Sequence, residues 1–247
     1  MNTEFHILIP ARLASTRLPR KALAEIGGRP LILHTLDRAW AAGAATVQVA
    51  TDSEAIAEVV VAAGGEVIMT RADHVSGTDR LAEAAASLGL PAEAVIVNLQ
   101  GDEPGMPAAC LRQVADLLLG APEAEMATLW QPVLDQAQWL DPNVVKLVLD
   151  DAGRALYFSR APIPHRRDGG WPEGLARRHV GLYAYRASAL QAWQSLPPAA
   201  LEELESLEQL RALAAGWQIV AAQACEAIPV GVDTHEDLAR LRLESEL

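Results

Sequence analysis

Residues 7–21 are ILIPARLASTRLPRK, a segment that holds both the first predicted strand and a strongly basic loop. The apolar run from Phe5 to Ile9 predicts a buried strand, and Pro10 is expected to end it. The loop that follows contains four Lys or Arg residues and no acidic residue before Glu25. Loops that leave the carboxyl end of the first strand commonly bind ligands in α/β folds. The segment therefore predicts an α/β fold with an anion site at this loop.

The basic side chains of this loop suit the oxygens of a triphosphate. Arg can bind two phosphate oxygens at once, and Lys supplies a point charge. The chain carries a net charge of −12, so a local excess of positive charge requires an explanation. The loop matches neither glycine-rich phosphate motif, so side chains, including the hydroxyls of Ser15 and Thr16, would have to bind the phosphates. The alternative is a solvated surface loop, and charge alone favours neither interpretation.

Composition limits the classes of partner that this chain can have. With 247 residues, of which 51% are hydrophobic, it is long enough to bury a large core. The sequence pI near 4.9 argues against a nucleic acid polymer or an anionic membrane as a partner. No apolar run is long enough to cross a bilayer, and the first residues do not form a signal peptide. Cys110 and Cys225 lie far apart in the sequence, which favours two buried thiols in a reducing, cytoplasmic compartment.

Strand and helix patterns alternate through the first half of the chain. Strands are predicted at 5–9, 46–50, 66–69 and 94–99, and helices at 30–42, 53–63, 79–88 and 107–119. This alternation predicts a doubly wound, mostly parallel, Rossmann-like α/β sheet. Strand patterns then recur at 126–130, 144–149 and 180–185, with an irregular Pro- and Arg-rich segment at 161–178. We interpret residues 1–247 as one domain with a strand-rich insertion or dimerisation arm at about 125–186. Helices at 201–215 and after Thr234, with a strand near 219, complete the pattern.

Residues 98–104, NLQGDEP, follow the most apolar predicted strand. This position places Asp102 at the carboxyl edge of the sheet, beside the basic loop. A carboxylate repels a triphosphate unless Mg²⁺ lies between them, and Mg²⁺ typically binds one or two carboxylates together with substrate phosphates. Asp233, in the segment GVDT at 231–234, is a candidate second carboxylate. The alternatives are a turn-capping role for Asp102 and a helix-start role for Asp233.

Two further groups of polar residues are weaker candidates. Residues 71–80, RADHVSGTDR, form a polar loop suited to a nucleotide base or ribose, although an ordinary loop capped by Thr78 explains them equally simply. His179, Tyr183, Glu208 and Gln209, taken singly, favour strand or helix-face positions over ligand contacts.

Taken together, eight segments resemble the 3-deoxy-D-manno-octulosonate (Kdo) cytidylyltransferases in family order. They are IPARLASTRLPRK, VATD, MTRADHVSGTDRLAE, VIVNLQGDEP, ALYFSRAPIP, HVGLYAYR, LEQLR and GVDT, and they span nearly the whole chain. The sialic-acid cytidylyltransferases share the fold but usually carry a different first loop. The resemblance implies a nucleotidyltransferase-type fold and Mg²⁺-dependent transfer of CMP from CTP to Kdo, which releases pyrophosphate and activates Kdo for lipopolysaccharide synthesis. Separately from the resemblance, the strand-rich arm at about 125–186 predicts a homodimer.

The resemblance carries roles to matching positions of this chain. Arg12 and Lys21 would hold the β- and γ-phosphates and, with Asp102, form the catalytic set, and Asp102 and Asp233 would bind Mg²⁺. The remaining nucleotide contacts would come from Ala11, Ser15, Arg17, Arg71, Ser76, Gly77, Thr78 and Arg80. The sugar acid would be surrounded by Gln100, Gly101, Arg167, His179, Tyr183, Glu208 and Gln209, with Arg167 against its carboxylate.

The chain also departs from the family pattern at named positions. Arg20 stands where the family usually has Gly, Gly105 replaces a bulkier residue, and His165-Arg166 replace an aromatic–acid pair ahead of a shortened segment at 169–178. Two other functions stay open. A regulatory nucleotide-binding module would not need both Asp102 and Asp233. An enzyme for 8-amino-Kdo or sialic acid would differ by few contacts.

Overall fold

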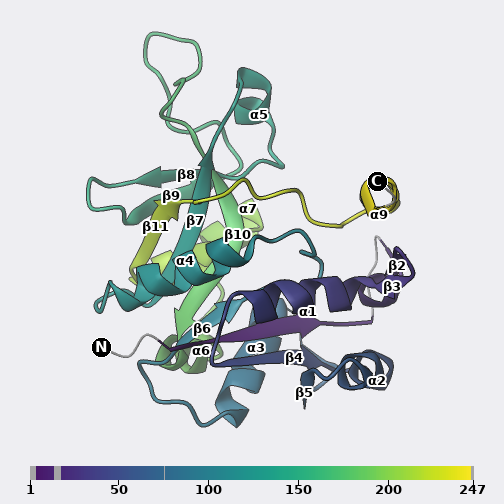
Figure 1. The fold of residues 1–247 in the computed structure, drawn as a ribbon. Helices are drawn as coiled ribbons and strands as arrows, with labels where there is room; N and C mark the ends of the chain where they lie inside the picture. The colour runs from purple at the N-terminus through teal and green to yellow at the C-terminus, as the bar shows by residue number, and fades with distance from the viewer. Residues whose placement is uncertain (1–3, 14–17, 75, 246–247) are drawn as a thin grey trace.

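The computed structural model describes residues 4–13, 18–74 and 76–245, and these residues form a nine-stranded sheet covered by helices on both faces (Figure 1). The main path of the sheet has the order β11-β7-β10-β6-β1-β4-β5. Its strands are β1 (Phe5–Ala11), β4 (Thr46–Thr51), β5 (Glu66–Met69), β6 (Val95–Asn98), β7 (Met126–Pro132), β10 (Arg177–Arg186) and β11 (Ile219–Gln223). Along this path β10 runs antiparallel to both neighbours, and the other strands share one direction. The predicted mostly parallel sheet is confirmed.

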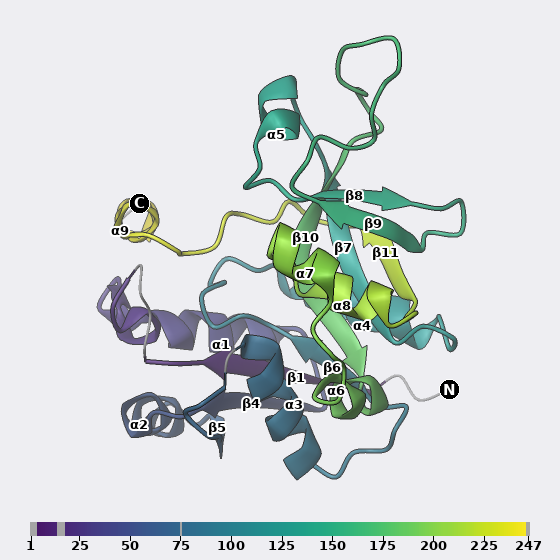
Figure 2. The ribbon, with the colours of Figure 1, turned by 180° about the vertical axis from the view of Figure 1, so that it is seen from behind.

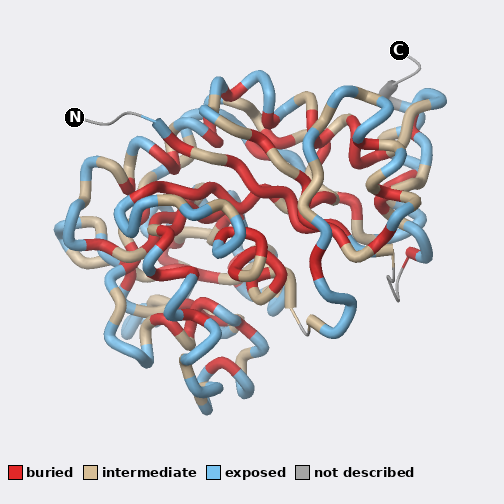
Figure 3. Tube along the Cα trace, turned by 90° about the horizontal axis from the view of Figure 1, so that it is seen from below, coloured by how far each residue is buried: buried red, intermediate tan, exposed pale blue. Residues whose placement is uncertain are grey.

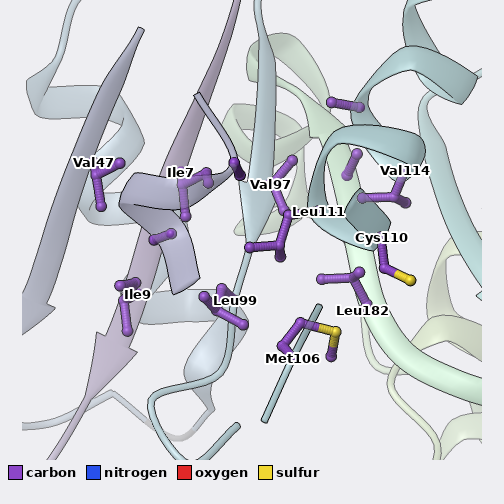
Figure 4. Close-up of a cluster of buried hydrophobic side chains, with 14 of the residues drawn as sticks. Ile7, Ile9, Val47, Val97, Leu99, Met106, Cys110, Leu111, Val114 and Leu182 are labelled. Carbon is purple, nitrogen blue, oxygen red and sulfur yellow. The ribbon is translucent and has the colours of Figure 1, made fainter. Parts of the chain in front are cut away.

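Helices cover the two faces of the sheet as the alternation of β1 side chains requires. Ile7 and Ile9 point into a core shared with α1 (Leu31–Ala41), α2 (Glu54–Ala62) and α4 (Ala108–Leu119), part of which is drawn in Figure 4. Leu8 points to the opposite face, which packs against α3 (Gly77–Ser87), α6 (Ala187–Trp193) and α8 (Gln209–Ala214) (Figure 2). Buried residues accordingly follow the central strands, whereas exposed residues line the outside of the molecule (Figure 3).

The remaining elements lie at the ends of the sheet. Strands β8 (Lys146–Leu149) and β9 (Ala155–Ser159) extend it from β10, and α5 (Gln136–Leu140) and the loop before β10 project beyond them (Figures 1 and 2). A short helix η1 (Lys21–Leu23) leads into the hairpin β2 (Glu25–Ile26)–β3 (Arg29–Pro30), and α9 (His235–Ser245) lies beside that hairpin. Helix α7 (Ala200–Glu205) precedes α8. No helix in the described ranges is long and apolar enough to cross a bilayer.

The first strand runs past Pro10, contrary to the sequence prediction, and ends at Ala11. The carbonyl of Leu8 accepts a hydrogen bond from the Leu99 amide (3.1 Å), so the backbone N–H and C=O groups of Leu8 point toward β6. The backbone of Pro10, two residues further along, points in the same direction, but β6 has already ended there. The missing N–H of proline therefore leaves no ladder bond unmade, which is the condition under which a strand tolerates proline.

Helix boundaries differ from the prediction at two places, the start of α3 and the segment 201–215. Helix α3 begins at Gly77 because the Ser76 side chain, and not Thr78, caps it by accepting from the Asp79 amide (3.1 Å). The single helix predicted at 201–215 is instead α7 and α8, separated by Ser206 in the left-handed conformation (φ 51°). A residue with positive φ cannot continue a right-handed helix. Six short elements, η1, β2, β3, α5, α6 and β9, were not predicted.

The cysteines also correct an expectation. Cys110 is buried on α4, but Cys225 is exposed, so the prediction of two buried thiols is wrong for Cys225. Their sulfur atoms lie 3.7 Å apart because α4 packs beside the end of β11, where the Gln113 side chain accepts from the Cys225 amide (2.9 Å). Burial raises the pKa of the Cys110 thiol to about 11.

Candidate active site

The strand order reverses between β1 and β6, because the chain continues from β1 to β4 on one side while β6 pairs on the other. Ligands of open α/β sheets bind beyond the carboxyl ends of strands at such a reversal. A cleft of about 220 Å³ lies there. Its wall contains ten of the predicted site residues: Ala11, Arg12, Lys21, Ser76, Gly77, Arg80, Gln100, Gly101, Asp102 and Asp233.

Two acidic residues that are far apart in the sequence meet at one amine in this cleft. Lys21 donates to Asp102 Oδ2 at 2.5 Å and to Asp233 Oδ1 at 3.0 Å. Burial alone would lower the pKa of Lys21, but hydrogen bonds to the two carboxylates and their charges raise it above its ordinary value. The two carboxylates therefore converge on a single cation, which in this structure is the Lys21 ammonium group; their predicted role as Mg²⁺ ligands stays a prediction.

Backbone contacts hold Asp233 beside Asp102. The Val232 amide donates to the Asp102 carbonyl at 2.9 Å, and the Asp233 and Thr234 amides donate to the Asp237 carboxylate that begins α9. Gly231 is needed for this approach, since a Cβ there would lie 2.7 Å from Glu103 Oε1 and 3.3 Å from the Asp102 carbonyl. The predicted capping pattern at Thr234 and Asp237 is thus confirmed, and it positions Asp233.

Arg20 precedes the site lysine in a left-handed backbone conformation, with φ 56° and ψ 31°. Glycine adopts this conformation without steric cost, whereas another L-residue pays about 1–2 kcal/mol. Arg20 therefore follows the backbone path that a glycine would follow, and the chain turns there so that Lys21 begins η1 and enters the cleft.

A third acidic group lies next to the two that contact Lys21. Glu103 packs behind Asp102, and burial, followed by the charges of Asp102 and Asp233, raises the pKa of its carboxyl to about 8. Near pH 7 that carboxyl is mainly protonated. Within the described chain, no group of three or more His, Cys, Asp or Glu side chains converges on one metal position. A metal bound by Asp102 and Asp233 would therefore complete its coordination with ligand oxygens and water, as Mg²⁺ usually does.

The opposite wall of the cleft is the beginning of α3. Ser76 and Gly77 lie there, and His74 hydrogen-bonds to Glu83 behind them. Arg80 lines the cleft, but its guanidinium is buried and paired with Asp52 at 2.9 Å. Arg80 thus ties α3 to the segment that follows β4, and its charge is already balanced within the protein.

A second cavity, of about 290 Å³, adjoins the cleft and shares Gly77 and Gln100 with it. Its wall includes five more predicted residues: Thr78, His179, Tyr183, Glu208 and Gln209. The Thr78 hydroxyl donates to Glu208 at 2.8 Å, and burial raises the pKa of the Glu208 carboxyl. The Tyr183 hydroxyl is buried and has no hydrogen-bond partner among the described residues. This cavity is lined by both polar and aromatic side chains and is large enough for a sugar.

Several predicted residues lie elsewhere. Arg71 is exposed and pairs with Asp73 at 3.1 Å, and the exposed Arg167 lies on the projecting loop before β10; neither is part of the wall of either cavity. Ser15 and Arg17 lie outside the described residues. Sequence reasoning also missed Asn98, Tyr185 and Trp193, which line the second cavity. The two-residue period of β10 places Tyr185 on the face of Tyr183 and was the available signal.

Comparisons with known proteins show which family the chain resembles in sequence and fold. A family model described as cytidylyltransferase matches residues 6–221. The 3-deoxy-manno-octulosonate cytidylyltransferase of Xanthomonas campestris pv. campestris is 52% identical over 98% of this chain and 89% of its own length. That of Pseudomonas fluorescens is 51% identical over 98% of both chains. A solved CMP:2-keto-3-deoxy-manno-octonic acid synthetase complexed with CTP has a TM-score of 0.91 and 41% identity, covering 99% of this chain and 100% of its own.

More distant structures share the fold alone. A 4-diphosphocytidyl-2C-methyl-D-erythritol synthase has a TM-score of 0.66 at 16% identity, with 98% of each chain covered.

Proposed function

The chain belongs to the cytidylyltransferase family, and we propose that it transfers CMP from CTP to Kdo and releases pyrophosphate. One observation supports this most strongly: a cleft with a lysine between two aspartates opens beside a polar cavity of sugar size, and Gly77 and Gln100 belong to both. Relatives that are about half identical over nearly the whole chain bear the name of this reaction.

In this proposal the cleft holds the triphosphate and the second cavity holds the sugar acid. The C2 hydroxyl of Kdo attacks the α-phosphorus and releases its proton to water. An O–P bond forms, and the bond from the α-phosphorus to the bridging oxygen breaks with departure of pyrophosphate. Negative charge grows on the phosphoryl oxygens and on the leaving group. Arg12 and Lys21 are positioned beforehand at the cleft, where cations stabilise that charge more in the transition state than in the ground state.

We propose further that the reaction depends on Mg²⁺ held by Asp102 and Asp233. The donor set fits, because two carboxylates from separate segments already converge on one cation. When bound, Mg²⁺ would supply charge neutralisation at the phosphates and lower the pKa of the attacking hydroxyl. With the carboxylates taken by the metal, the Lys21 ammonium group would be available to bind a phosphate oxygen.

Pyrophosphate release over a panel of nucleotides and sugar acids tests the proposal. We expect turnover with CTP and Kdo, and an Asp102→Asn variant with kcat lowered at least about a hundredfold while CTP binding changes less than about threefold. Asp116→Asn, the same change at an exposed position of α4, is the matched control and should behave as wild type. Turnover only with 8-amino-Kdo or sialic acid would replace Kdo as the substrate, and no turnover with any pair would favour a regulatory module.

We also propose a homodimer that forms through the projecting arm, the part of the chain that includes α5 and the loop before β10. Leu134, Leu140 and Leu175 lie on the arm with 75%, 52% and 61% of their surface exposed, around a small buried cluster that contains Val133, Trp139 and Ala176. Exposed apolar groups gathered in this way favour a protein contact. Light scattering should give twice the chain mass for wild type and a single chain mass when the three leucines are changed to Gln. Leu204→Gln, at an exposed leucine of α7, is the control. A monomeric wild type would rule out this assembly.

A further inference from the structure

Thr128 is a fully buried polar residue that the reaction described above does not use. It lies in β7, opposite the point where the register of β10 shifts between Val180 and Tyr183. The extra residues of β10 form a bulge, and a bulge leaves carbonyl groups without ladder partners. The Thr128 hydroxyl reaches two of them, with Oγ1 at 3.1 Å from the Val180 oxygen and 2.8 Å from the Leu182 oxygen.

A third polar atom contacts the same hydroxyl. His179 Nε2 lies 3.1 Å from Thr128 Oγ1. A hydroxyl has one proton to donate, and carbonyl oxygens can only accept, so the proton of Thr128 points to the bulge carbonyls. The oxygen of Thr128 then has only lone pairs to offer to the imidazole. The contact is a hydrogen bond only if Nε2 carries a proton and donates it.

We propose that Thr128 is a positioning residue that holds His179 as the Nε2–H tautomer, so that Nδ1 is a hydrogen-bond acceptor for a hydroxyl group of the sugar acid. This inference rests on the proposed function of the second cavity, whose wall includes His179. The inference adds Thr128, which lies outside that wall, and it assigns His179 as a hydrogen-bond acceptor for the sugar acid. A neutral acceptor recognises a donor, and therefore a hydroxyl rather than the carboxylate of the sugar.

The surroundings of His179 keep the imidazole neutral. Its ring packs edge-on against Phe158 at a centroid distance of 5.0 Å and beside Tyr183 at 5.2 Å. Burial lowers the pKa of His179 to about 3. Among the described residues, no protein group hydrogen-bonds to Nδ1. In a neutral imidazole with a proton on Nε2, the lone pair of Nδ1 is left for a ligand.

The tautomer is tested directly, without turnover, by long-range ¹H–¹⁵N correlation spectra of the histidine rings of the full-length protein at neutral pH. We expect Nε2 of His179 in the protonated range and Nδ1 in the unprotonated range, with His179→Gln used to assign the signals. A proton on Nδ1, or on both nitrogens, would overturn the proposal. The tautomer is read from wild type without substrate, so apart from the His179→Gln spectrum used for assignment it does not depend on any variant folding.

Kinetics separates positioning from a purely structural role. Thr128→Val removes the hydroxyl at nearly constant volume, and we expect the Kdo KM to rise about five- to tenfold, with kcat and the CTP KM within about twofold. Thr128→Ser, which restores the hydroxyl, should recover the Kdo KM and the tautomer. Thr46→Val is the matched control, since Thr46 contacts His6 at 2.9 Å away from both cavities. An unchanged Kdo KM and tautomer in Thr128→Val would refute the proposal. Absence of Kdo turnover in wild type would overturn the proposed function instead.

Discussion

Acidification should destabilise this protein through His179 in a way that a single substitution can isolate. The ordinary pKa of 6.5 falls to about 3 in the folded chain because the ring is buried. Between these values the unfolded chain binds a proton that the folded chain does not. The contribution of His179 to stability is therefore fully present above pH 6.5 and is lost as the pH falls toward 3.

The size of this effect follows from the two pKa values. Each pH unit below the unfolded pKa costs about 1.4 kcal/mol, so lowering the pH from 7.0 to 5.5 removes about 1.3 kcal/mol of stability through this one group. His179→Gln has no ionisable ring and retains an amide that donates toward Thr128. The free energy of unfolding of wild type should therefore fall by about 1.3 kcal/mol more than that of the variant over this range.

Urea unfolding at pH 7.0 and pH 5.5 measures this difference, because other titrating groups contribute equally to both proteins. His165→Gln changes an exposed histidine on the projecting arm and should keep the full acid sensitivity of wild type. Equal losses of stability in wild type and His179→Gln would refute the assignment of a buried, neutral imidazole.

Three other outcomes are expected. Gly231→Ala should lower kcat by about ten- to a hundredfold, because the added Cβ would lie 2.7 Å from Glu103 and displace Asp233. Circular dichroism should show little change in the overall fold, and a wild-type kcat would contradict this prediction. Arg20→Gly should raise the free energy of unfolding in urea by about 0.5–1 kcal/mol, because glycine adopts the left-handed backbone conformation of Arg20 without steric strain. A loss of stability would show instead that the arginine side chain makes a compensating contact. Removal of divalent metal with a chelator should reduce pyrophosphate release more than about a hundredfold and added Mg²⁺ should restore it, whereas persistent turnover would exclude the metal role.

The periodicity of hydrophobic residues was sufficient to predict the central strands and helices. It was insufficient where one backbone conformation or one capping residue determines where a helix begins or ends. The alternating strands and helices up to α4 follow from hydrophobic spacing, but the order of the strands in the sheet was not predicted. Ser76 and Thr78 are both good caps, and only the packing of α3 selects Ser76. The left-handed Ser206 carries no local sequence signal, yet it divides α7 from α8.

The candidate site was predictable to different depths. Local chemistry suggested a basic loop and two candidate metal carboxylates, Asp102 and Asp233, which are distant in sequence but lie side by side through the Val232 contact. Thr128 could not be found this way, because a buried threonine in a strand is ordinary until the bulge opposite it is known. The thiol contact of Cys110 and Cys225 likewise depends on tertiary packing and on no local pattern.

A crystal structure with CTP and Mn²⁺, located by its anomalous scattering, tests the central claim most directly. We expect one metal peak bounded by carboxylate oxygens of Asp102 and Asp233 and by phosphate oxygens, with Lys21 Nζ moved from the carboxylates to the phosphates. A metal peak distant from both aspartates, or Lys21 still bonded to them with the nucleotide in place, would contradict it.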